Sequence, residues 1–82
     1  MTINDLAHLH FSMQGYFMSD SKLKSGDDTI RYTGYLNSEG AFYIMEEDLD
    51  AGEFRYYFGK EDYSTYWAAR ESISYQLYSA VV

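Results

Sequence analysis

Hydrophobic and polar residues alternate along much of this 82-residue chain, with the period of two that is typical of half-buried β-strands. The alternation predicts four strands, over residues 10–18, 29–36, 41–46 and 54–58. Asn37–Gly40 is predicted to be a hairpin turn, because Gly follows three polar residues between two β-prone runs. We also expect a turn at Ala51-Gly52, a polar loop over 19–28 and a short helical turn over 1–9. The strands would then form an antiparallel meander.

The pattern changes near the C-terminal end from a period of two to spacings of three and four. Apolar residues recur there at Tyr66, Ala69, Ile73, Leu77 and Ala80. This spacing predicts one helix with a single apolar stripe. Either Asp62 is its N-cap, or Glu61 and Asp62 lie in its first turn, where the helix dipole favours them. Packing the stripe on the sheet gives one α+β domain over residues 1–82. In it, a four-stranded antiparallel β-meander packs on one C-terminal α-helix in two layers.

The same alternation predicts which side chains lie on the sheet face away from the helix. We expect the helix to cover Phe11, Ile30, Phe42 and Phe54. The opposite face would then carry Tyr16, Arg31, Tyr35, Tyr43, Arg55 and Tyr57. Tyr and Arg are enriched at the centres of protein interfaces. Cross-strand tyrosine pairs also stabilise exposed sheets, so a partner-binding face and a purely structural face are both open interpretations.

The predicted helix has few charges on its exposed side. From residue 63 to residue 82 only Arg70 and Glu71 are charged, whereas solvent-facing helices usually carry many Lys and Glu residues. One interpretation is a homodimer through this C-terminal helix, with Tyr75 and Tyr78 at the seam. The alternative is that Trp67 and Tyr78 pack over the edge of the sheet, as large aromatic residues in small domains usually do.

Composition limits the classes of partner. The chain has 13 acidic and 6 basic residues and a net charge of −7. It should therefore be repelled by phosphates, and neither nucleic acid nor an anionic membrane is expected as a direct partner. No apolar run approaches the ~20 residues that span a bilayer. Residues 1–10 do not resemble a signal peptide, and Cys is absent. These features predict a soluble cytoplasmic protein.

The acids are concentrated in one short segment. Five of them lie within eight residues: Glu46, Glu47, Asp48, Asp50 and Glu53. Extended at ~3.3 Å per residue, the segment would present a charge every ~5 Å, comparable with the ~3.4 Å phosphate spacing of a DNA strand. Such an array can occupy an Arg- and Lys-rich groove that binds nucleic acid. A solvated loop that prevents edge aggregation is the alternative interpretation.

No pattern in the sequence indicates catalysis, a metal or a cofactor. Neither a phosphate-binding glycine loop nor a nucleophile elbow occurs. The acidic segment is polar, so nothing apolar there would raise a carboxyl pKa for acid–base chemistry. His8 and His10 lie two residues apart but have no Cys partner. Residues 48–53 lack the order of a calcium loop. We therefore predict a non-enzymatic protein without metal or cofactor.

Two segments resemble the small acidic anti-CRISPR proteins of phages. Ile3-Asn4-Asp5-Leu6 is similar to the start of the Cas9-inhibiting members, and Asn37–Gly40 followed by Tyr43-Ile44 is similar to their central hairpin. In that family, acids of the hairpin tip and nearby loops occupy the Cas9 surface that would read the PAM. Glu39 and Gly40 match the tip. The next acidic position of the family falls on Phe42 here, and the family ends in two helices where one is predicted for this chain.

The resemblance and the charge pattern together predict an inhibitor that binds a nucleic-acid-handling protein. The first expected target is a CRISPR effector in the cytosol of a phage-infected cell. Charge would come from Glu39, Glu46, Glu47, Asp48, Asp50 and Glu53, and contact area from Tyr35, Tyr43 and Tyr57. An immunity or antitoxin-like protein that blocks a toxic nuclease is an alternative. A self-associating structural phage protein is another.

Overall fold

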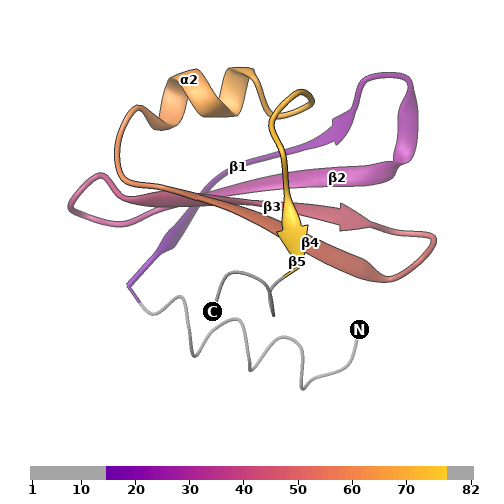
Figure 1. Cartoon of the computed structure of the whole chain (residues 1–82), viewed down its shortest axis with the longest axis horizontal. Coiled ribbons are helices and arrows are strands. Elements are labelled where there is room, and N and C mark those ends of the chain that lie inside the picture. The colour runs from indigo at the N-terminus through magenta and orange to yellow at the C-terminus, as the bar shows by residue number, and fades with distance from the viewer. Residues whose placement is uncertain (1–14, 78–82) are drawn as a thin grey trace.

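The computed structural model describes residues 15–77, which form one antiparallel sheet with a short helix on one face (Figure 1). The strands are β1 (Phe17–Lys24), β2 (Asp27–Leu36), β3 (Phe42–Asp48), β4 (Glu53–Gly59) and β5 (Gln76–Leu77). They lie side by side in chain order, and the helix α2 (Tyr63–Ala68) comes between β4 and β5. The predicted α+β class and antiparallel meander are confirmed, with five strands in place of four.

The first strand lies further along the chain than predicted. The expected polar loop over 19–28 instead forms most of β1 and the start of β2. A two-residue turn, Ser25-Gly26, connects these strands because Gly26 takes a positive φ of 73°. Alternation missed β1 because polar residues are tolerated on an edge strand. The predictions for residues 1–14, which include the helical turn, His8, His10 and Phe11, lie outside the described residues.

The two predicted turns form, and each is stabilised by the polar residue that precedes it. Asn37 Oδ1 accepts hydrogen bonds of 2.9 Å from the backbone N–H groups two and four residues later. Asp48 Oδ1 accepts hydrogen bonds of 3.0 Å from the N–H groups two and three residues later. Such side chains replace the missing backbone partners in a tight turn. They therefore hold the β2–β3 and β3–β4 hairpins in one register.

The register of the β3–β4 hairpin decides the faces of β4. Phe42 lies opposite Gly59, so even-numbered residues of β3 share a face with odd-numbered residues of β4. Arg55 and Tyr57 therefore lie on the helix face. The other face carries Phe54, Tyr56 and Phe58. The prediction had these two sets reversed, because β4 is aromatic on both faces and its own pattern does not determine the register.

Buried side chains form two clusters, one on each face of the sheet. On the helix face, the buried residues are Tyr32, Phe42 and Ile44, packed by Tyr63, Tyr66, Trp67, Ile73 and Tyr75 among others. On the other face, the buried residues are Tyr43, Met45 and Tyr56, packed by Tyr16, Tyr35 and Phe54. Because this second face holds side chains that are almost fully buried, it is not the open face that the sequence predicted.

The C-terminal helix is much shorter than predicted. It ends at Ala68 after six residues, and consecutive turns lead from there to β5, which pairs with β4. Of the two predicted helix starts, the structure has the one with Asp62 as N-cap, but the backbone of Asp62 is left-handed (φ 65°) and its side chain makes no capping hydrogen bond. Ser72 and Ser74 follow, and serine favours turns over helix interiors because its hydroxyl competes for backbone groups.

The residues after the helix pack back onto the sheet. The ring centroids of Tyr75 and Tyr32 are 5.7 Å apart, and the Tyr75 hydroxyl donates a 2.8 Å hydrogen bond to the carbonyl of Arg70. Tyr75 is therefore not at a helical dimer seam, and Tyr78 lies outside the described residues. Trp67 packs against the helix-face cluster, with the Arg70 guanidinium 4.7 Å from its ring centroid.

Candidate partner-binding surface

The acidic segment forms a hairpin in place of an extended array. Glu46, Glu47 and Asp48 end β3, Glu53 begins β4, and Asp50 lies in the turn between them. Alternation separates the β3 acids, so that Glu46 and Asp48 lie on the helix face and Glu47 lies on the other. The expected linear spacing of charges is therefore wrong, because the chain folds back on itself.

Folding places two further acids beside this hairpin. The turns after β1 and after β3 lie at the same end of the sheet, since neighbouring strands are antiparallel. The backbone N–H of Leu49 also donates a 2.7 Å hydrogen bond to the carbonyl of Thr29. We call the resulting group the acidic end; its residues are Asp27, Asp28, Glu46, Glu47, Asp48, Asp50 and Glu53. Asp27 and Asp28 could have been assigned to this group from the sequence if Ser25-Gly26 had been recognised as a turn.

Hydrogen bonds orient two carboxylates of the acidic end. Besides the turn contacts of Asp48, the backbone N–H and the hydroxyl of Thr29 donate bonds of 2.9 and 2.6 Å to Asp27 Oδ1. These bonds, the hydroxyl first, lower the pKa of the Asp27 carboxyl below its ordinary value of 3.8. Asp27 is therefore charged at neutral pH, and its carboxylate is already oriented in the free protein.

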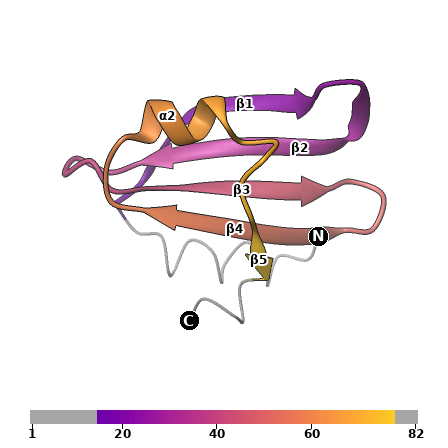
Figure 2. The same ribbon diagram turned by 45° about the horizontal axis from the view of Figure 1, so that its top comes forward.

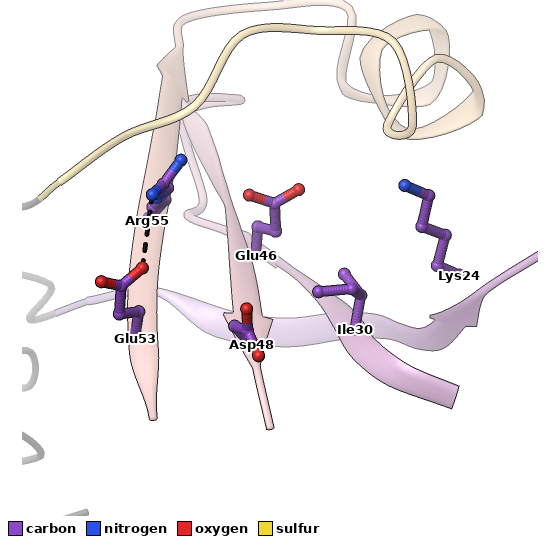
Figure 3. Close-up of a pocket in the computed structure, with 6 residues that line it drawn as sticks. All are labelled: Lys24, Ile30, Glu46, Asp48, Glu53 and Arg55. Atoms are coloured by element: carbon purple, nitrogen blue, oxygen red, sulfur yellow. Dashed lines mark hydrogen bonds and ion pairs between the residues drawn. The ribbon is translucent and has the colours of Figure 1, made fainter. Parts of the chain in front are cut away.

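A shallow cavity of about 200 Å³ opens at this end of the sheet, on the helix face (Figure 3). It is lined by one apolar residue, three acids and two bases: Ile30, Glu46, Asp48, Glu53, Lys24 and Arg55. Arg55 Nη2 and Glu53 Oε1 form a half-exposed ion pair of 3.3 Å, and no other ion pair occurs within residues 15–77. The Tyr32 hydroxyl donates a 3.2 Å hydrogen bond to Glu46 Oε2.

Glu39 does not join the acidic end. It lies in the turn between β2 and β3, at the opposite end of the sheet. The rise along β3 separates the two ends by roughly 20 Å, at ~3.3 Å per residue. A contact made by Glu39 would therefore be separate from a contact made by the acidic end.

The three tyrosines predicted to bind a partner do not share a face. Tyr35 and Tyr43 stack on the face away from the helix, with ring centroids 4.5 Å apart and planes at 13°. Tyr57 lies on the helix face and stacks on Tyr66 at 5.2 Å. Tyr43 is only 4% exposed, so it contributes to the core and not to a contact surface. Its burial raises the pKa of its hydroxyl.

The described part of the chain has neither a cluster of side chains that could hold a metal ion nor a helix that could cross a membrane. Among residues 15–77, no group of three or more His, Cys, Asp or Glu side chains is placed to hold a metal ion. The one helix in these residues is too short and too polar to cross a membrane.

Comparisons with known proteins find no relative of this chain. No protein-family model matches it, and neither a curated protein nor a solved structure does. Any function proposed for it therefore rests on the residues and contacts described above.

Proposed function

We propose that this protein is a non-enzymatic inhibitor that binds the nucleic-acid-binding surface of another protein. The observation that carries the proposal is the acidic end, where two neighbouring hairpins gather seven carboxylates at one end of a sheet. Carboxylates held in fixed positions compete with phosphate for Arg and Lys side chains. A basic groove that normally binds nucleic acid is therefore the surface that fits the acidic end.

The charges of the acidic end are available to a partner. Glu53 has an ion-pair partner in Arg55, whereas the remaining carboxylates of the acidic end form no ion pair within residues 15–77. An exposed ion pair such as this one contributes only ~0–1 kcal/mol, so a partner can displace it at little cost. The net charge of −7 also favours rapid association with a basic surface.

A CRISPR effector is the first target that we propose. The support is the resemblance of Asn37–Gly40 to the hairpin tip of acidic anti-CRISPR proteins, together with the turn formed by these residues. Glu39 is exposed at that turn. In this proposal the acidic end makes the main electrostatic contact, and Glu39 makes a second contact at the other end of the sheet.

Competition for guide-loaded Cas9 tests the proposal. The full chain is expected to displace a labelled target DNA from the effector, and rising salt should weaken the displacement because salt screens exposed charges. Asp50→Lys removes a carboxylate that makes no hydrogen bond among residues 15–77, and it should weaken binding about tenfold.

Glu61→Lys is the matched control. It changes the net charge by the same amount, but Glu61 is exposed next to the start of α2, away from the acidic end. We expect its affinity to stay within about twofold of the original. Equal weakening by both variants would mean that only net charge matters, and would contradict a specific role of the acidic end. Binding of the isolated chain to DNA would contradict the proposal altogether.

A further inference from the structure

β1 is one edge of the sheet (Figure 2). It pairs with β2 on one side, and no strand of residues 15–77 lies on its other side. An edge strand directs unpaired N–H and C=O groups outward, where another strand can bind them. β1 has eight residues, and its pairing with β2 is regular from Asp20 to Leu23, with a register shift on either side of that stretch. The edge at β5 is different, because β5 has only two residues.

β1 also carries exposed apolar side chains. Six large apolar side chains are exposed among residues 15–77, and three of them belong to this strand: Phe17 (71%), Met18 (66%) and Leu23 (47%). Phe17 lies opposite Leu36 on the helix face, whereas Met18 and Leu23 lie opposite Tyr35 and Arg31 on the other face. The strand therefore exposes apolar surface on both sides of its edge, which favours association there.

The charges on β1 select one arrangement for pairing with a second copy. Asp20 and Lys22 lie on the same face, two residues apart, and neither forms an ion pair within residues 15–77. In a symmetric antiparallel pair of strands, the residue on the two-fold axis faces itself. Centring on Ser21 places Asp20 of each copy opposite Lys22 of the other. Centring on Asp20 sets acid against acid, and centring on Leu23 sets Lys22 against Lys24, which is destabilising. Centring on Lys22 places Asp20 opposite Lys24 but sets Lys22 against itself, so Ser21 is the centre that gives opposite charges without a like-charge pair.

We propose that two copies of this chain pair through their β1 edges, antiparallel and centred on Ser21, so that their sheets join into one. Two Asp20–Lys22 pairs cross the seam. β1 has two lysines and one acid in a chain of net charge −7, so this edge is locally basic and reduces the repulsion between two acidic chains. This dimer differs from the helical dimer predicted from the sequence and does not depend on the proposed function.

Charge exchange tests the arrangement. Sedimentation equilibrium of the full chain is expected to show a dimer. Lys22→Glu sets acid against acid at both pairs and should raise the dimer Kd about tenfold or more. Asp20→Lys sets base against base with the same expected effect. An equimolar mixture of the two variants should restore the dimer, because every acid then faces a base.

Cross-linking tests the position of the axis. The chain has no Cys, so Ser21→Cys introduces one thiol per copy. Residues directly opposite in antiparallel strands have Cα atoms about 4.5–5.5 Å apart, which a disulfide can bridge. Mild oxidation should therefore link this variant into a covalent dimer, and should leave the control Ser38→Cys, in the exposed β2–β3 turn, largely unlinked.

Three results would each overturn the proposal. They are a chain that stays monomeric at high micromolar concentration, a dimer that Lys22→Glu leaves unchanged, and equal cross-linking of the two cysteine variants. Circular dichroism of each variant checks the fold. Asp20→Lys also removes the hydrogen bond that Asp20 accepts from Tyr63, and this loss could itself change the fold. Lys22→Glu leaves that hydrogen bond in place, so its effect on the dimer can be interpreted without Asp20→Lys.

Discussion

The hydroxyl of Tyr63 donates a 2.8 Å hydrogen bond to Asp20 Oδ2. To reach Asp20, the Tyr63 side chain crosses β2 at Gly34, and its ring lies directly against that glycine. This contact joins α2 to β1 across β2, between residues 43 positions apart. Burial and then the Asp20 carboxylate raise the pKa of the Tyr63 hydroxyl, which therefore stays protonated and able to donate. The absence of a side chain at Gly34 allows the ring to lie this close to the strand.

Gly34→Ala is expected to destabilise the fold. A Cβ at this position would overlap the Tyr63 hydroxyl and ring carbons, and overpacking of this kind costs about 1–3 kcal/mol. Urea unfolding of the full chain measures the loss. The double variant with Tyr63→Ala is the control, because the ring is then gone and the further cost of Gly34→Ala should largely disappear. A full additional cost in that background would show that the contact with Tyr63 is not the cause.

Asp48 is expected to stabilise the β3–β4 turn through its hydrogen bonds and not through its charge. Asp48→Ala removes the acceptor of two backbone N–H groups and should lower the free energy of unfolding by ~1–2 kcal/mol. Asp48→Asn keeps a side-chain oxygen that can accept these hydrogen bonds, so it should retain most of the stability that Asp48→Ala loses. Asp50→Ala, in the same turn, should change stability by less than ~0.5 kcal/mol. Equal losses for Asp48→Ala and Asp48→Asn would mean that charge is the source of the effect.

The contact of Glu71 with Ser25 makes part of the stability dependent on pH. The N–H and hydroxyl of Ser25 donate bonds of 2.9 and 3.0 Å to Glu71 Oε2, and these bonds lower the pKa of Glu71 below 4.5. A carboxyl pKa that is lower in the folded state adds stability above the ordinary value of 4.5. This contribution is lost as the pH falls through the lowered pKa.

Comparison of Glu71→Gln with the original chain measures this contribution. The two should differ in urea midpoint at neutral pH and converge in acid, once the carboxyl of Glu71 is protonated. Glu61→Gln is the control, since Glu61 makes no hydrogen bond within residues 15–77. A difference between Glu71→Gln and the original chain that persists unchanged at pH well below 4.5 would contradict the assignment.

Local signals in the sequence were enough for the central strands and their turns. The side chains of Ile30, Tyr32 and Phe42 alternate as half-buried strands require, and Asn37 begins a turn that needs only its own neighbours. Local sequence patterns gave wrong predictions where the conformation of a segment depends on contacts with distant parts of the chain. Residues 19–22 of β1 are all polar, so alternation did not indicate a strand there, and an edge strand needs no second apolar face. The predicted helix was too long, because contacts with the sheet, such as that of Tyr75 with Tyr32, determine the conformation after Ala68 more strongly than the apolar spacing does.

The composition of the candidate site was visible in the sequence, but its arrangement was not. Glu46 to Glu53 stood out as an acidic run, whereas the adjacent position of Asp27 and Asp28 required the β1–β2 hairpin to form. By itself, then, the sequence determined an antiparallel meander with a strongly acidic segment, because alternation, turn residues and charge act over a few positions. Only the tertiary structure decided which aromatic residues are buried on each face and which acids meet. Both depend on strand register, and a slip of one residue moves every side chain to the other face.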